Sequence, residues 1–61
     1  MEEKHRSYYF FCQGELIEEV DADTDSDALS ELHKRGYRVQ SSFDYYTRYD
    51  RVTKQMELFK V

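Results

Sequence analysis

Apolar and polar positions at the start of the chain predict a β-hairpin. Residues 8–12 are apolar or aromatic at every position, which is typical of a strand that is buried on both faces. Gln13 and Gly14 follow and predict a tight turn, because glycine accepts the positive φ that short hairpin loops require. Residues 15–20 form the returning strand, so we expect a hairpin over residues 7–21.

The register of this hairpin stays open at the level of sequence. A two-residue loop pairs Phe10 with Ile17, whereas a three-residue loop pairs Phe11 with Ile17. Because side chains alternate along a strand, a slip of one residue exchanges the two faces of the hairpin.

The clearest pattern lies in residues 24–36 and predicts a helix over residues 25–35. Its apolar stripe consists of Ala28, Leu29 and Leu32 at helical spacing. The flanking signals are an N-cap at Thr24 with Asp27 in the capping-box position, Asp25 in the first turn, Lys34 and Arg35 in the last turn, and Gly36 as the C′ residue. Tyr37 is then placed to close on Leu32.

Residues 37–61 predict a second hairpin. Residues 37–45 alternate with period two, which places four side chains on one face: Tyr37, Val39, Phe43 and Tyr45. The alternation breaks around residues 47–50, where we expect a turn. Residues 52–61 are expected to form the last strand, with Val52, Met56 and Leu58 on its inner face.

Together these elements predict a small α+β protein of the order β-β-α-β-β. We expect residues 1–61 to form a single domain, with residues 1–6 frayed. One helix covers one face of a four-stranded, mainly antiparallel sheet. The strand order 2-1-3-4 is favoured, because it places the doubly apolar first strand in the middle, while the order 1-2-3-4 would leave it at an edge.

Length and composition bound the class of protein. The chain has 61 residues, 39% hydrophobic and 16% aromatic, which is too apolar for a disordered segment. No apolar run approaches the ~20 residues that a bilayer span needs, so we expect no membrane contact and no signal peptide, and a cytoplasmic location. The single cysteine, Cys12, excludes an intrachain disulfide framework and a cysteine-rich zinc site.

Charge is divided unevenly between the two halves. The net charge is −4, yet residues 1–31 hold ten acids against two bases and residues 32–61 hold seven bases against three acids. An acidic total argues against a general nucleic-acid binder. The acids of the second strand, Glu18, Glu19 and Asp21, are instead expected to attract a basic partner surface.

Metal binding and catalysis are not indicated. Aspartates at positions 21, 23, 25 and 27 resemble the start of a calcium loop, but Ser26 and Leu32 replace its glycine and its bidentate glutamate. We interpret these acids as a connection that caps the helix. Cys12 has no positive neighbour in sequence that would activate its thiol, and His5 and His33 complete no recognisable motif. We therefore expect no enzyme, no catalytic residue, no metal and no cofactor.

The aromatic residues are the candidate functional feature. If Tyr8, Phe10 and Cys12 point at the helix, a second set points away from it: Tyr9, Phe11, Tyr46 and Phe59, with Arg38 beside them. Exposed aromatic side chains with arginine are typical of protein-interface hot spots. The leading hypothesis is thus a non-enzymatic protein-binding module, of the size of phage-type or regulatory accessory proteins that modulate a larger host protein.

Two alternatives stay open. Tyr9, Phe11, Tyr46 and Arg38 are also the residue types that stack single-stranded nucleic acid. A structural homodimer would bury the same aromatic face against a second copy.

Residues 20–36 carry the pattern of Ala22, Thr24, Ala28 and Leu29 followed by Leu32 and Gly36. This pattern is similar to a hairpin–helix module in the amino-terminal part of type II secretion platform proteins and in a family of small phage inhibitors of host RNA polymerase. The resemblance covers less than half of the chain and implies the local fold only, since those families differ in function.

Overall fold

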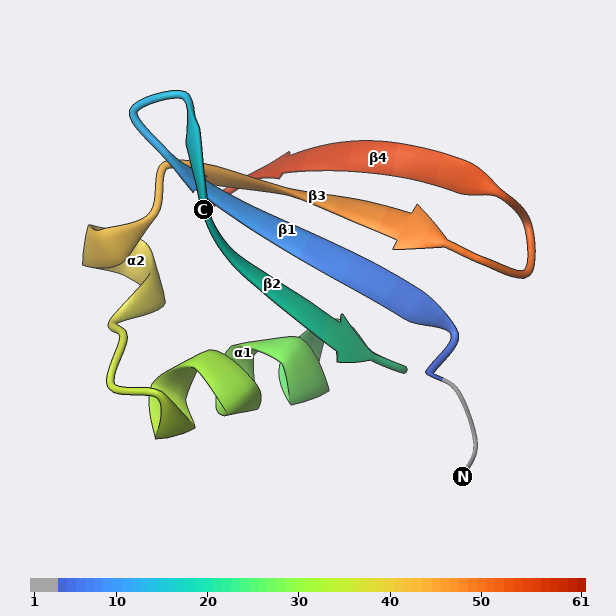
Figure 1. Ribbon diagram of the computed structural model, residues 1–61, viewed down its shortest axis with the longest axis horizontal. Helices are drawn as coiled ribbons and strands as arrows, with labels where there is room; N and C mark the ends of the chain where they lie inside the picture. The colour runs from blue at the N-terminus through green and yellow to red at the C-terminus, as the bar shows by residue number, and fades with distance from the viewer. Residues whose placement is uncertain (1–3) are drawn as a thin grey trace.

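The computed structural model describes residues 4–61, and within them the chain forms one antiparallel sheet with a helical layer on one side (Figure 1). The elements are β1 (Arg6–Cys12), β2 (Glu15–Ala22), α1 (Asp25–Lys34), α2 (Val39–Ser42), β3 (Tyr45–Asp50) and β4 (Gln55–Lys60). The strand order is β2-β1-β3-β4, with every pair antiparallel. The predicted α+β class and the favoured strand order are confirmed.

The first hairpin has the predicted two-residue turn but neither predicted register. Gln13 and Gly14 have φ values of 53° and 81°, the positive pair that matches the twist of the flanking strands. Phe11 then pairs with Leu16, while Phe10 pairs with Glu18, so Ile17 is the extra residue of a β-bulge.

The bulge decides which side chains of β2 reach the helix. Without it, a two-residue loop would set Glu19 opposite Tyr8, on the side of the sheet that carries the core. With it, Val20 stands opposite Tyr8 and is 2% exposed. The extra residue therefore allows the hairpin to keep its two-residue turn and still place an apolar side chain of β2 in the core.

Helix α1 has the caps that its sequence predicts. The Thr24 hydroxyl oxygen accepts a hydrogen bond from the Asp27 N–H at 3.2 Å. At the other end, the Gly36 N–H donates to the His33 carbonyl at 3.0 Å and the Tyr37 N–H donates to the Leu32 carbonyl at 3.1 Å.

The segment after α1 differs from the prediction. Residues 39–42 form the short helix α2 instead of a strand, and β3 begins only at Tyr45. Val39 and Phe43 are four residues apart, so one helical turn puts both of them against the core as well as a strand would. The expected turn at residues 47–50 is likewise displaced, because the Asp50 carboxylate accepts from the N–H groups of Val52 and Thr53 and so opens the turn at residues 51–54.

The core lies between β1, β2 and the two helices. Its buried hydrophobic side chains are Tyr8, Phe10, Val20, Ala22, Ala28, Leu32 and Phe43, with Tyr37, Val39 and Tyr46 packed against them. Val52, Met56 and Leu58 are not on the inner face as expected, since they are 72%, 59% and 61% exposed.

The described part of the amino-terminal segment is anchored. Arg6 already opens β1, and the His5 N–H donates to the Asp23 carboxylate at 3.0 Å. The expectation of fraying for residues 1–3 lies outside the described residues.

Candidate functional site

The side of the sheet opposite α1 is covered by no helix within residues 4–61 (Figure 1). Because side chains alternate along each strand and Tyr8 and Phe10 face the helices, their neighbours face the other way. We call this side the open face. Its side chains form three rows across β2, β1, β3 and β4: Leu16, Phe11, Tyr45 and Lys60; Glu19, Tyr9, Thr47 and Leu58; Asp21, Ser7, Tyr49 and Met56.

The open face is aromatic in the middle and most exposed along β4. Phe11 and Tyr45 stack with ring centroids 4.9 Å apart and planes 9° from parallel. Next to these central rings, Leu58 is 61% and Met56 59% exposed. Contiguous exposed apolar side chains of this kind are characteristic of interaction surfaces.

Charged groups lie at the margins of the open face. Asp21 is paired with Arg51, whose guanidinium nitrogen lies 3.0 Å from a carboxylate oxygen and also donates to the Ser7 hydroxyl. Within residues 4–61, the side chains of Glu19 and Lys60 enter no ion pair. An uncompensated acid on β2 and an uncompensated base on β4 therefore flank the aromatic centre.

The structure divides the residues that the sequence assigned to one partner-binding surface. Tyr9, Phe11, Glu19 and Asp21 lie on the open face. Tyr46, Phe59, Glu18 and Arg38 do not, so the expectation that Tyr46 and Phe59 point away from the helix is wrong. Tyr46 stands opposite both Phe10 and Phe59 and stacks with each of these rings on the helix side.

Sequence reasoning missed Tyr45, Tyr49, Met56 and Leu58, which complete the open face. The direction of each side chain in β3 and β4 follows from the residue at which β3 begins. Residues 37–45 were expected to form one strand with Tyr45 on the same face as Phe43, and this expectation is wrong, because α2 interrupts the strand and Tyr45 stacks on Phe11 on the open face while Phe43 is buried in the core. The Asp50 turn signal was the one local feature that could have placed the strand end.

Glu18 links the sheet to the end of α1. Its carboxylate lies 2.7 Å from a guanidinium nitrogen of Arg35 and accepts from the Tyr37 hydroxyl at 2.8 Å. That hydrogen bond raises the pKa of the Tyr37 phenol above its usual range. Glu18 therefore has internal partners that hold β2 to the helix.

Asp25, in the first turn of α1, is the centre of a polar cluster on the helix side. It accepts from the Tyr8 hydroxyl at 2.7 Å, from the Tyr46 hydroxyl at 3.1 Å and from Arg48 at 3.0 Å. Burial acts to raise the pKa of Asp25, but these three hydrogen bonds outweigh it and hold the pKa below its usual range. The Arg48 guanidinium also lies 4.7 Å from the centre of the Phe59 ring.

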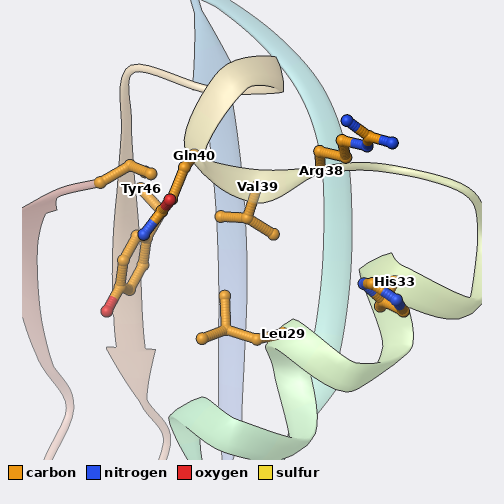
Figure 2. A pocket seen from close by; sticks show the side chains of 7 residues that line it. Leu29, His33, Arg38, Val39, Gln40 and Tyr46 are labelled. Carbon is orange, nitrogen blue, oxygen red and sulfur yellow. The ribbon is translucent and has the colours of Figure 1, made fainter.

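A groove of about 530 Å³ opens beside this cluster, between α1, α2 and β3 (Figure 2). Its lining residues are Leu29, His33, Arg38, Val39, Gln40, Tyr46 and Val61. Leu29 and Val39 point toward each other across it, and Arg38 and His33 lie at the side of the groove next to the end of α1. The lining is mainly apolar, with its positive charge at that one end.

Three of the four aspartates at positions 21, 23, 25 and 27 have separate partners. Asp21 is bonded to Arg51, Asp23 to the His5 N–H, and Asp25 to the cluster just described. Within residues 4–61, no three or more histidine, cysteine or acidic side chains are grouped as metal ligands. Cys12 is a half-buried free thiol.

In the part of the chain that the structure describes, no helix has the length and apolar character needed to cross a membrane. Comparisons with known protein families, with curated proteins and with solved structures find no match to this chain.

Proposed function

We propose that this chain is a non-enzymatic protein-binding module and that the open face is its contact surface. The observation that carries the proposal is the continuous exposed apolar surface from the central rings to Leu58 and Met56 on β4. Aromatic and methionine side chains at the centre, with charged groups at the rim, form the usual composition of a protein interface.

The pattern of the open face favours a partner other than a second copy. Two copies can pack open face to open face in two ways that keep their strands aligned and related by a two-fold axis. In the first, β2 of one copy lies over β4 of the other, and Glu19 would be buried over Leu58. In the second, each strand lies over the same strand of the other copy, so that Glu19 would lie over Glu19 and Leu16 over Asp21. The second arrangement desolvates two facing carboxylates, and the first buries Glu19 over an apolar side chain with Lys60, one row away on β4, as the nearest base; both are costly. We therefore favour a partner whose apolar patch is flanked by a basic side chain that meets Glu19.

Single-stranded nucleic acid is the weaker alternative. The group suggested for base stacking is divided, because Tyr9 and Phe11 lie on the open face while Tyr46 and Arg38 line the groove on the other side. The uncompensated Glu19 would also repel phosphates. In this proposal the partner is a larger host protein, and the chain acts as a phage-type or regulatory accessory protein in the cytoplasm, where the free thiol of Cys12 stays reduced.

The experiment compares two variants that each remove an exposed apolar side chain. Leu58→Ser changes the open face, whereas Val52→Ser changes the turn after β3, where the side chain is 72% exposed. Each tagged protein is used to capture partners from source-cell lysate treated with nuclease. The recovered protein is then identified, purified and titrated into isotope-labelled chain by NMR.

We expect Val52→Ser to retain the partner and Leu58→Ser to lose it, with amide shifts concentrated in the four strands, Glu19 on β2 included, and none in α1 or α2. Equal capture by both variants, or capture that nuclease abolishes, would contradict the proposal. Light scattering provides the second arm: a mass near twice 7.5 kDa that returns to 7.5 kDa in Leu58→Ser would favour the homodimer instead.

A further inference from the structure

The helical layer covers only part of the sheet. Four strands about 4.8 Å apart span about 14 Å between the outer two, while a helix is about 10 Å wide. Helix α1 packs on the β2 side, and β3 and β4 extend away from it beyond β1 (Figure 1). The helix-side surface of β3 and β4 therefore lacks a helix of its own.

The groove of Figure 2 borders this uncovered half. Leu29, on the flank of α1, is 38% exposed and Val61 is 41% exposed, although both line a mainly apolar surface. Phe59, which stacks on Tyr46, is only half-buried. Leu29, Tyr46, Phe59 and Val61 thus form an apolar strip between α1 and the Tyr46–Phe59 end of β3 and β4, and the Arg48–Glu57 ion pair borders this strip on the next row of the sheet.

Charge defines one end of the groove. Arg6, Arg35, Arg48 and Arg51 are all ion-paired to acids of this chain. Arg38, at the rim of the groove, is the arginine whose side chain enters no ion pair or hydrogen bond within residues 4–61. An apolar groove with an uncompensated arginine at one end fits an occupant that is apolar along its length and acidic at one end.

We infer that the groove receives an amphipathic helix of a partner protein, with an aspartate or glutamate of that helix paired to Arg38. A helix beside α1, at the usual interaxial distance of about 8–10 Å, would cover the apolar strip at the Tyr46–Phe59 end of β3 and β4. If the partner helix runs antiparallel to α1, its first turn lies next to Arg38. Acidic residues are favoured in a first turn because the helix dipole is positive there, so such an acid is also placed to pair with Arg38. This site lies on the opposite side of the sheet from the open face and does not depend on the proposed function.

The probe is a display library of 16-residue peptides with leucine at positions spaced as i, i+3, i+4 and i+7 and all other positions randomised. Selection on the immobilised chain is expected to enrich peptides with an acid in the first turn. Arg38→Gln should weaken a selected peptide about two- to fivefold, the range for a partly exposed ion pair. Leu29→Ser should weaken it at least tenfold, and Leu58→Ser, on the open face, should leave its affinity unchanged.

Charge exchange separates a direct contact from a folding defect. Arg38→Glu should weaken binding of the selected peptide more than Arg38→Gln does, and a peptide whose acid is replaced by lysine should bind Arg38→Glu more tightly than it binds the wild type. Circular dichroism melts of Leu29→Ser check that the chain still folds, since this side chain lies at the surface of α1. The inference is overturned if no peptide is enriched, if amide shifts map to the open face, or if the lysine peptide binds Arg38→Glu no more tightly than it binds the wild type.

Discussion

Asp25 is the residue on which most of the polar contacts between the helix and the sheet depend. At the level of sequence it is an acid in a first helical turn, where it complements the helix dipole. In the fold it also accepts hydrogen bonds from Tyr8 on β1 and from Tyr46 and Arg48 on β3. One carboxylate therefore connects three elements, and its removal leaves part-buried donors without an acceptor.

Replacement of Asp25 should destabilise the protein more than replacement of its neighbour in the same turn. We expect Asp25→Ala to lower the free energy of unfolding at neutral pH by about 1–3 kcal/mol, the cost of part-buried polar groups left without partners. Asp27→Ala keeps the backbone N–H that donates to Thr24 and loses an interaction with the helix dipole, so it should cost about 0.3–1 kcal/mol. Urea denaturation followed by circular dichroism measures both, and equal losses would contradict the role of the cluster.

The stabilisation by Asp25 should also depend on pH. Its pKa in the folded state lies below the value of about 3.9 for an unfolded aspartate, because Tyr8, Arg48 and Tyr46 donate to the charged form despite the opposing effect of burial. Stabilisation is therefore present above about pH 4 and is lost as the pH falls through the folded-state pKa. The difference between wild type and Asp25→Ala should shrink on acidification, and a difference that stays constant down to pH 2 would refute this coupling.

Tyr8 and Tyr46, like Tyr37, should ionise above the usual pKa of a phenol. Burial raises the pKa of both phenols, and the Asp25 carboxylate raises it further. A group whose pKa is raised by folding contributes stability below the unfolded value of about 10, and this stability is lost as the pH rises through the folded value. Titration of tyrosinate absorbance should show ionisation at higher pH in the folded than in the denatured protein, and Tyr8→Phe or Tyr46→Phe should each remove part of the absorbance that appears at the highest pH.

Caps and turns determine the structure at the scale of the elements. The helix α1 ends at Gly36 with a φ of 95°, and the first hairpin turns at Gly14 with a φ of 81°. A Cβ atom at either glycine would meet no other atom within 4 Å, so any cost of substitution comes from the backbone alone. At both positions the sequence has glycine where the backbone has a positive φ.

Substitution of the helix-ending glycine should carry this backbone cost. Gly36→Ala is expected to lower the free energy of unfolding by about 1–2 kcal/mol, because alanine disfavours the left-handed conformation. Ser30→Ala, at an exposed position inside α1, should be neutral or stabilise by up to about 0.5 kcal/mol. Thermal melts of both variants give the comparison, and a Gly36→Ala protein as stable as wild type would show that the cap relaxes.

At the scale of the whole molecule, the aromatic side chains of the sheet form two sets on its opposite sides. The rings on the helix side stabilise the fold, whereas the rings and apolar side chains of the open face have no counterpart in the described residues. A sheet of four strands with one long helix leaves one side uncovered and the other half covered. The open face and the strip between α1 and the Tyr46–Phe59 end of β3 and β4 both expose apolar side chains, and for this reason we propose a partner for each.

Stability measurements should separate the two sides. Phe10 is fully buried, so Phe10→Ala should cost about 3–5 kcal/mol, comparable with the whole stability of a chain of this size, about 3–9 kcal/mol. Leu58→Thr, on the open face, should change stability by less than about 0.5 kcal/mol. Urea denaturation curves give the free energy of unfolding of both variants, provided that their m-values equal that of the wild type. A large loss of stability in Leu58→Thr would mean that the open face is covered in the free protein.

By itself, the sequence determined the local elements and the place of the first strand. The hairpin turn at Gln13 and Gly14 and the helix from Thr24 to Gly36 follow from φ preferences, caps and charges that act over a few residues. The central position of β1 follows from its apolar character on both sides, which only an interior strand can bury. These signals act within one element, so no other part of the chain is needed to interpret them.

Only the tertiary structure decided which side chains share a surface. The bulge at Ile17 is set by the need to bury Val20 opposite Tyr8, and this contact joins β2 to a core formed by distant segments. The short helix after α1 delays the start of β3 to Tyr45, which turns Tyr46 toward the helices. Because side chains alternate with period two, a shift of one residue in register or in strand start moves a whole row to the other face, and this shift is decided by packing between elements rather than by the sequence within one.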